Sequence, residues 1–200
     1  MYRLLFFAVF SLFVIKAEAQ TVTDMFIDMP DSIIPYIDNK QRKELVELKQ
    51  MEPDSTATIG NNLGKIKLTR LSDSILTLQL SECNTIELGK LEDNKFVFIK
   101  TYGAPLQESL CCIIDNKWRK IKMVDFSDIN FIQESDSIPE LEQREMMRLL
   151  EFSLISASIA TIPDELIIKL NTPLVTTEEK KKFDAIILQR NVKWNGKTFN

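Results

Sequence analysis

The sequence predicts an α+β fold in which antiparallel β-meanders pack with helices that are segregated from the strands. Three observations support this prediction. Between Lys65 and Val124, short apolar runs alternate with turn residues, as in strands joined by tight hairpins. Helical periodicity flanks this region, near residues 38–51 and 139–150. Further short apolar runs follow the second helix, so the order suggests a degenerate duplication of a helix-plus-meander unit.

The first residues have the layout of a secretory signal peptide. Arg3 precedes an unbroken apolar run from Leu4 to Ile15, and small residues spaced one apart end at Ala19. This run is shorter than the roughly 20 residues of a membrane-spanning helix. We therefore expect residues 1–19 to be removed as a signal peptide, although a retained anchor or a buried core helix is the rival interpretation. No cysteine follows the site, which disfavours a lipid anchor. The mature chain is expected to be soluble in the periplasm or outside the cell, without a transmembrane segment.

Residues 20–132 form the first predicted unit, a helix followed by an antiparallel meander. Asp38 and Gln41 match a capping box, and apolar residues then recur at helical spacing as far as Met51. Proline and glycine between residues 53 and 64 end the helix. The expected strands are the apolar runs 66–71, 75–80, 86–91, 96–99 and 110–114.

Residues 133–200 form the second predicted unit, either separate from the first or continuous with it in one domain. Pro139 and Glu140 suit the first turn of a helix that runs to about Leu150. Alternation over 152–161 and the apolar run 166–170 predict strands. After a polar stretch with a cap-like Thr-Thr-Glu-Glu run, residues 183–188 and 193–199 are predicted to form a closing hairpin.

Composition excludes several classes of function. The chain has 25 basic and 29 acidic residues and a net charge of −4, so we expect no nucleic-acid partner. It contains no histidine, which removes Ser-His-Asp and Cys-His catalysis and histidine-ligated zinc. With five glycines and no phosphate-binding motif, the chain gives no sign of a nucleotide cofactor. We predict no catalytic, cofactor-binding or metal-ligating residues and no cofactor.

Carboxylate pairs are the remaining route to hydrolytic chemistry. Glu82 with Glu87, or Asp125 with Asp128, are pairs of the type that glycoside hydrolases use. Asp125, Asp128 and Asn130 also suggest a calcium loop, but that loop lacks the glycine and the distal glutamate of an EF-hand. Turns stabilised by side-chain hydrogen bonds explain these residues equally well.

The three cysteines allow one candidate disulfide. In an oxidising compartment Cys83 can pair with Cys111 or with Cys112. The two neighbours point to opposite faces of a strand, so at most one of them faces Cys83. The alternative is that all three are small core residues.

Trp118 and Trp194 are candidate aromatic contacts for a sugar or a peptide, because each directly follows a lysine at the expected start of a strand. Core packing is the alternative role.

Four serines, each preceded by aspartate, are candidate O-glycosylation sites, because their Asp-Ser pattern resembles the rule for this modification in the envelope of Bacteroidetes. Asp-Ser is also ordinary turn and cap chemistry. The four are Ser32, Ser55, Ser74 and Ser137.

The mature region resembles an uncharacterised secreted family of Bacteroidales, a domain of unknown function. This resemblance implies a source and a compartment, and it supplies no catalytic residues. The segments that carry it are 25–36, 76–80, 101–105, Trp118, 154–158 and 194–196.

Function follows from these exclusions more than from any motif. We expect a non-catalytic periplasmic or surface-associated module that binds an envelope protein, a peptide or a glycan through a sheet face or a lobe interface. The alternative is a carboxylate-dependent hydrolase of envelope or dietary glycan. A third interpretation is an inhibitor or accessory subunit of another enzyme.

Overall fold

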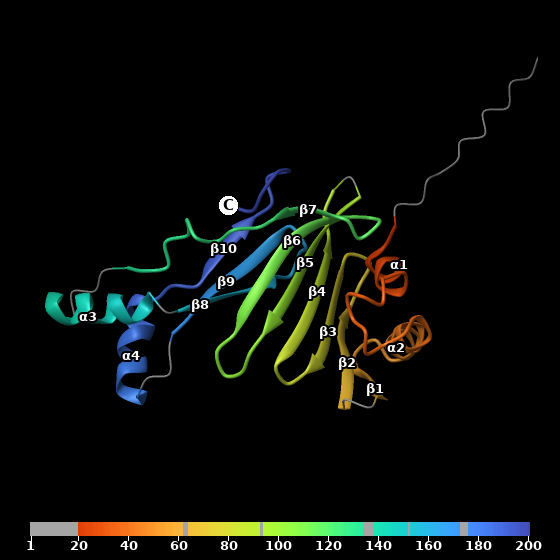
Figure 1. Ribbon diagram of the computed structural model, residues 1–200, viewed down its shortest axis with the longest axis horizontal. Coiled ribbons are helices and arrows are strands. Elements are labelled where there is room, and N and C mark those ends of the chain that lie inside the picture. The colour runs from red at the N-terminus through yellow and green to blue at the C-terminus, as the bar shows by residue number, and fades with distance from the viewer. Residues whose placement is uncertain (1–19, 62–63, 93, 134–137, 152, 173–175) are drawn as a thin grey trace, which may run out of the picture.

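Ten strands and four helices make up the described part of the chain, in a computed structural model that covers residues 20–200 apart from 62–63, 93, 134–137, 152 and 173–175 (Figure 1). The predicted signal peptide and Ser137 therefore lie outside the described residues. In chain order the elements are α1 (Val22–Ile27), α2 (Asn39–Met51), β1 (Ala57–Asn61), β2 (Gly64–Leu71), β3 (Ile75–Ser81), β4 (Asn84–Lys90), β5 (Lys95–Tyr102), β6 (Glu108–Asp115), β7 (Lys120–Met123), α3 (Glu140–Leu150), β8 (Leu154–Ile159), β9 (Glu165–Asn171), α4 (Thr177–Ile186) and β10 (Arg190–Lys193).

The first seven strands form one antiparallel meander in the order β1 to β7, so each strand pairs with its neighbours in sequence. The α+β fold class and the first meander are thereby confirmed. The five predicted strands correspond to β2–β6, and β1 and β7 extend the sheet at its two edges. The registers interrupt at bulges, one of them between Ile113 and Ile114 where β6 meets β7.

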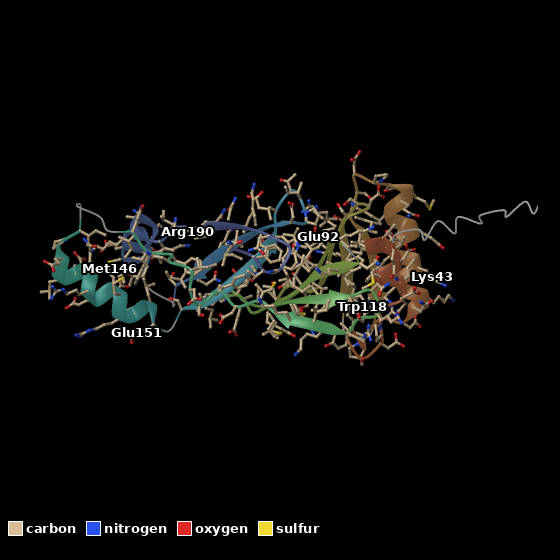
Figure 2. The ribbon with its side chains drawn as sticks, turned by 90° about the horizontal axis from the view of Figure 1, so that it is seen from above. Lys43, Glu92, Trp118, Met146, Glu151 and Arg190 are labelled. Carbon is tan, nitrogen blue, oxygen red and sulfur yellow. The ribbon has the colours of Figure 1, made fainter. Side chains whose placement is uncertain are left out.

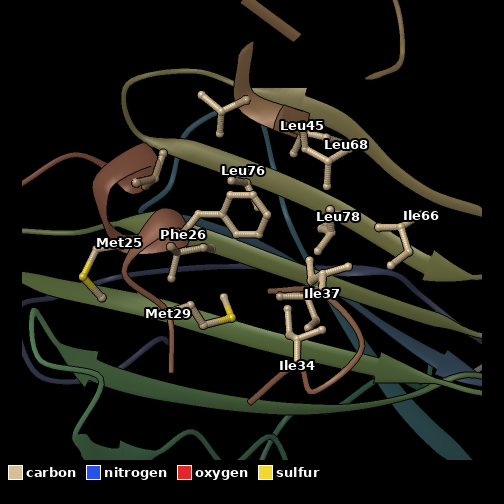
Figure 3. Packing of buried hydrophobic residues seen from close by; sticks show 14 of the residues in the cluster. Met25, Phe26, Met29, Ile34, Ile37, Leu45, Ile66, Leu68, Leu76 and Leu78 are labelled. Atoms are coloured by element: carbon tan, nitrogen blue, oxygen red, sulfur yellow. The ribbon is translucent and has the colours of Figure 1, made fainter. Parts of the chain in front are cut away.

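Helices α1 and α2 cover one face of this sheet over β1–β4 (Figure 1). Helix α2 begins as the sequence predicts, because the Gln41 N–H donates to Asp38 Oδ1 at 2.8 Å and the Asp38 N–H donates to Gln41 Oε1 at 3.0 Å. Side chains from α1, α2 and the connection between them pack on the sheet (Figure 3). The labelled members of this first core are Met25, Phe26, Met29, Ile34, Ile37, Leu45, Ile66, Leu68, Leu76 and Leu78.

A buried arginine fastens the connection between α1 and α2. Arg42 is only 2% exposed. Its guanidinium donates to the Ile27 carbonyl oxygen at 3.3 Å, to the Ile37 carbonyl oxygen at 2.9 Å and to Asp31 Oδ1 at 3.0 Å. The charge is therefore satisfied by three acceptors along the 27–37 connection, which holds that connection over the sheet.

A second sheet, in the order β10-β9-β8, packs on the opposite face of the large sheet. A second core lies between the sheets and takes residues from both predicted units, among them Val97, Ile113, Ile159 and Val192. The seven-stranded sheet therefore has helices on one face and strands on the other.

The free edge of β8 bonds to side chains of the large sheet. The Ala157 N–H donates to Ser109 Oγ at 2.9 Å, and the Ile159 N–H donates to Glu87 Oε2 at 2.8 Å. Arg70 donates to the carbonyl oxygen of Ala160, the residue that follows β8, at 2.7 Å. These bonds satisfy edge groups that a strand otherwise leaves unpaired.

The predicted closing hairpin is wrong in its first arm. Residues 183–186 belong to α4, whose first turn is capped by the Thr176 hydroxyl, which accepts a hydrogen bond from the Glu179 N–H. The apolar run was mistaken for a strand, but it forms one face of a helix in which Phe183 and Ile186 pack against Met146 of α3. Because α4 separates β9 from β10, the second unit does not repeat the helix-plus-meander order of the first.

Candidate functional site

On the helix side of the large sheet, burial decreases along β5 and β6. Phe96 is fully buried, but Tyr102 on the same side of β5 is 38% exposed. Ile114 is 3% exposed, but Leu110 on the same side of β6 is 53% exposed. The change arises because α1 and α2 cover β1–β4 and leave this end of β5 and β6 without a helix (Figure 1).

We call this uncovered surface the open face. The register places its residues on one side of three neighbouring strands, because Phe98 pairs with Cys112, and Cys112 pairs with Met123. Tyr102, Leu110 and Met123 are exposed, and Phe98 and Cys112 are half-buried. The open face is defined as Phe98, Tyr102, Leu110, Cys112 and Met123.

Trp118 lies at the border between the open face and the helices (Figure 2). It occupies the turn before β7 with a φ of 62°. Its indole N–H donates to the Met25 carbonyl oxygen at 3.0 Å, and its ring meets Phe98 edge to face with centroids 5.5 Å apart. This side chain, a candidate ligand contact from the sequence, therefore ties α1 to the β6–β7 turn.

Two lysines lie on the same side of the sheet as the open face. The Lys100 ammonium lies 5.2 Å from the centre of the Tyr102 ring. Lys120 pairs with Ile114 and so projects to the same side. Burial raises the pKa of the Cys112 thiol, and the Lys120 charge partly offsets this effect. Cys112 is thus protonated at neutral pH and contributes an apolar surface rather than a nucleophile.

The net charge of the whole chain conceals this basic surface. The stretch from Lys117 to Lys122 contains Arg119 and three lysines but no acidic residue, although the chain carries a net charge of −4. Charge counted in short windows finds this stretch.

Trp194 packs at the other side of the molecule, against the C-terminal residues. Its indole N–H donates to Glu92 Oε1 at 3.2 Å, and its ring lies 5.3 Å from that of Phe199. The Lys95 ammonium lies 6.0 Å from the ring centre. The two tryptophans therefore do not form a common surface, and each one makes contacts within the chain.

The structure does not bring the three cysteines together, and all three are free thiols. Cys111 and Cys112 point to opposite faces of β6, as predicted, because they pack in different cores. Cys83 is exposed in the β3–β4 turn, where its carbonyl oxygen accepts from the Gly103 N–H at 2.9 Å. Cys83 therefore lies level with Gly103, whereas Cys111 pairs with Ile99. The two cysteines are thus roughly 13 Å apart along the strand direction alone. A disulfide tolerates a Cα separation of about 7 Å.

Three of the four candidate glycosylation serines are described. Ser32 is exposed in the connection after α1, one residue beyond the Asp31 that accepts from Arg42. Ser55 is half-buried and its hydroxyl donates to the Glu52 carbonyl oxygen at 2.9 Å. Ser74 is half-buried in the β2–β3 turn. Ser32 is therefore the most accessible of the three.

Glu82 and Glu87, one of the two candidate carboxylate pairs, lie in different surroundings. Glu87 lies between the two sheets, where its acceptor oxygens bind the Ile159 N–H and, at 3.4 Å, the Thr77 hydroxyl. Burial raises its pKa. Glu82 is exposed in the turn beside Cys83.

Asp125 and Asp128 are exposed in the loop after β7. The Ser127 N–H donates to Asp125 Oδ1 at 2.9 Å, and hydrogen bonding from Ser127 lowers the pKa of Asp125. The Asn130 side chain accepts from the Ile132 N–H at 2.9 Å. These are turn contacts, and the described residues contain no group of three or more acidic or cysteine side chains arranged to hold a metal ion.

Two hollows flank α3. The larger, about 390 Å³, is lined by apolar residues, among them Phe131, Met147 and Leu150, and by the charged residues Arg148 and Glu151. The smaller, about 170 Å³, lies between α3 and α4 beside Glu142, Glu145 and Glu179. Over the described ranges, no helix has the length and apolar character required to cross a membrane.

The fold and the open face define an α+β protein of two stacked antiparallel sheets, with one sheet face left partly uncovered beside a basic edge strand. The chain belongs to the family described as protein of unknown function (DUF3256), which matches residues 14–199. A search of curated proteins found no match.

A solved structure has the same fold. It is a domain of an uncharacterized protein from Porphyromonas gingivalis W83, which aligns with a TM-score of 0.70 over 90% of this chain and 98% of that chain. The sequence identity is 17%, so this likeness concerns the fold alone. Its source is in Bacteroidales, the group that the resemblance in the sequence implied.

Proposed function

We propose that the chain is an exported, non-catalytic module that binds a polypeptide through the open face. The observation that carries the proposal is the exposure of Leu110, Met123 and Tyr102 on one side of neighbouring strands, at the place where the helix layer ends. Contiguous exposed apolar groups on a folded chain are typical of interaction surfaces.

The composition of the open face favours a polypeptide over a glycan. Tyrosine and methionine are enriched at protein interfaces. Sugar binding commonly uses an exposed aromatic ring as a stacking platform, but the Trp118 ring is in contact with Phe98 and its N–H is bonded to α1. The remaining aromatic ring, Tyr102, lies under the Lys100 ammonium.

A hydrolase is less well supported by the site. Its chemistry needs two carboxylates separated by about 5–9.5 Å around a substrate. Glu87, the carboxyl group between the two sheets, is bonded to the Ile159 N–H and serves to join those sheets. Export is part of the proposal because of the signal-peptide pattern in residues 1–19.

The proposal is tested by site-specific photo-crosslinking in the native host. A photoreactive amino acid is placed at Leu110 in one variant and at Lys43, exposed on α2 (Figure 2), in a control variant. We expect a discrete adduct from position 110 that is absent from position 43. Matching adduct patterns at the two positions, or no adduct at position 110, would contradict the proposal. Urea unfolding of both variants checks that the fold is retained.

A further inference from the structure

Strand β7 is the last strand of the large sheet, and it adjoins the open face. It pairs with β6 on one side, and no strand lies beyond it in the described part of the chain. All four of its residues are exposed. An edge strand of this kind presents backbone donors and acceptors to which an extended segment can bind.

The bulge in β7 places lysines on both faces of this edge. Lys120 pairs with Ile114 and lies on the helix side, while Lys122 pairs with Ile113 and lies on the side of the second core. Ile121 is the extra residue between them and is 55% exposed. The edge therefore carries a cation on each side and an apolar side chain between them.

This arrangement selects among possible occupants. A second copy that added its own β7 would bring lysines close to lysines, which destabilises strand pairing. A flat anionic membrane surface would meet only the lysine on one face. An extended strand with acidic side chains can place carboxylates near Lys120 on one face and near Lys122 on the other.

We propose that the partner segment is an extended, acidic polypeptide that adds to β7 as an eighth strand. Its backbone pairs with the free edge, its carboxylates lie beside Lys120 and Lys122, and an apolar side chain packs on Met123 at the border of the open face. This inference rests on the proposed function, since it names the class of partner for the same surface.

The first test uses a short blocked peptide, Val-Val-Glu-Glu-Val-Val, titrated into the ¹⁵N-labelled chain, because its adjacent glutamates point to opposite faces of a strand. We expect amide shifts confined to β7, Leu110 and their neighbours. A peptide with Gln in place of Glu tests the charge, and one with alternate N-methylated amides tests the backbone pairing. Both should bind at least about tenfold more weakly. Equal binding of either control peptide would overturn the inference.

The second test reverses the charges. Lys120→Glu with Lys122→Glu should weaken peptide binding at least about tenfold, whereas Lys40→Glu with Lys43→Glu on α2 should leave it unchanged. Equal losses in the two double variants would contradict the inference. Two other outcomes would also contradict the inference. One is self-association of the wild type that depends on concentration and is lost in the Lys120→Glu, Lys122→Glu variant. The other is a wild-type chain that binds phosphatidylserine vesicles but does not bind the peptide.

The two proposals can fail separately. If the adduct at position 110 forms equally well in the Lys120→Glu, Lys122→Glu background, the open face still binds a partner, but the acidic strand on β7 is wrong. If no adduct forms at position 110, the proposed function itself fails.

Discussion

Arg42 is the residue that holds the helix layer in place, because it joins α2 to both ends of the 27–37 connection. A buried guanidinium is favourable only when its donors are bonded. The sequence predicts the start of α2 from Asp38 and Gln41, but it gives no indication that Arg42 points inward. Its partners are mainly backbone carbonyl oxygens, which leave no pattern in the side chains.

We predict that Arg42→Met lowers the free energy of unfolding by about 3 kcal/mol, since it leaves the Ile27 and Ile37 carbonyl oxygens without their donor. The matched control is Asp31→Asn. Asp31 is 70% exposed, so losing its charge should cost less than about 1 kcal/mol. Urea unfolding of the three proteins measures the difference. Equal losses for the two variants would show that the ion pair, and not the carbonyl contacts, is the important part.

Glu87 gives a pH-dependent prediction at the same scale. Burial raises its pKa above the ordinary value of 4.5, so folding favours the protonated form. The stability that Glu87 contributes is present at low pH and is lost as the pH rises through its pKa in the folded state. We therefore expect the unfolding free energy of the wild type to fall, relative to Glu87→Gln, as the pH increases above about 4.5. Urea unfolding of both proteins across this range tests the sign, and parallel pH profiles would contradict it.

Individual elements show where sequence patterns are sufficient and where they are not. The capping box of α2 and the turn residues of β2–β6 identify those elements, because both signals are local. Helix α1 was not predicted, since its six residues are too few to show a period. Helix α4 was mistaken for a strand because Phe183 and Ile186 lie in an apolar run, although the Thr176–Glu179 cap that precedes it was visible.

The close packing of the two sheets leads to a prediction for Gly89. A Cβ atom at this position would lie 2.9 Å from Ile159 Cδ1 and 2.9 Å from Val97 Cγ1. We expect Gly89→Ala to destabilise the fold by about 1–3 kcal/mol through overpacking. Gly60→Ala in β1 is the control, since its Cβ atom would meet nothing within 4 Å, and it should be neutral or stabilising by up to about 1 kcal/mol. Thermal unfolding of the two variants gives the comparison.

The whole molecule is a three-layer arrangement of helices, large sheet and small sheet (Figure 1). The sequence predicts its class but not the stacking of the sheets, because that depends on contacts between distant residues such as Ser109 with Ala157. The candidate site was hidden for a related reason. Leu110 lies diagonally across from Met123 only because the register of β6 and β7 pairs Met123 with Cys112. A net charge of −4 does not indicate the basic edge.

The export proposal makes a prediction for the chain as a whole. The first described helix begins at Val22 with Thr21 as its cap, so removal of residues 1–19 leaves this cap intact. We expect protein isolated from the envelope of the native host to begin at Gln20, as intact-mass measurement and N-terminal sequencing will show. An Ala19→Arg variant should retain the leader. A native protein that still carries residues 1–19 would contradict the export proposal.

The same mass measurement tests glycosylation. A glycan on Ser32 would appear as added mass that Ser32→Ala removes.

The bonds along the free edge of β8 also imply an order of folding. Ser109 and Glu87 are separated from their β8 partners by 48 and 72 residues, and Arg70 is separated from Ala160, just after β8, by 90 residues. The large sheet, in contrast, is built from hairpins between consecutive strands. Local hairpins form faster than distant contacts. As the chain is made from its N-terminus, the large sheet can therefore assemble first and act as a template. The small sheet completes its hydrogen bonds only when it docks, and it should be the first part to detach when the protein opens.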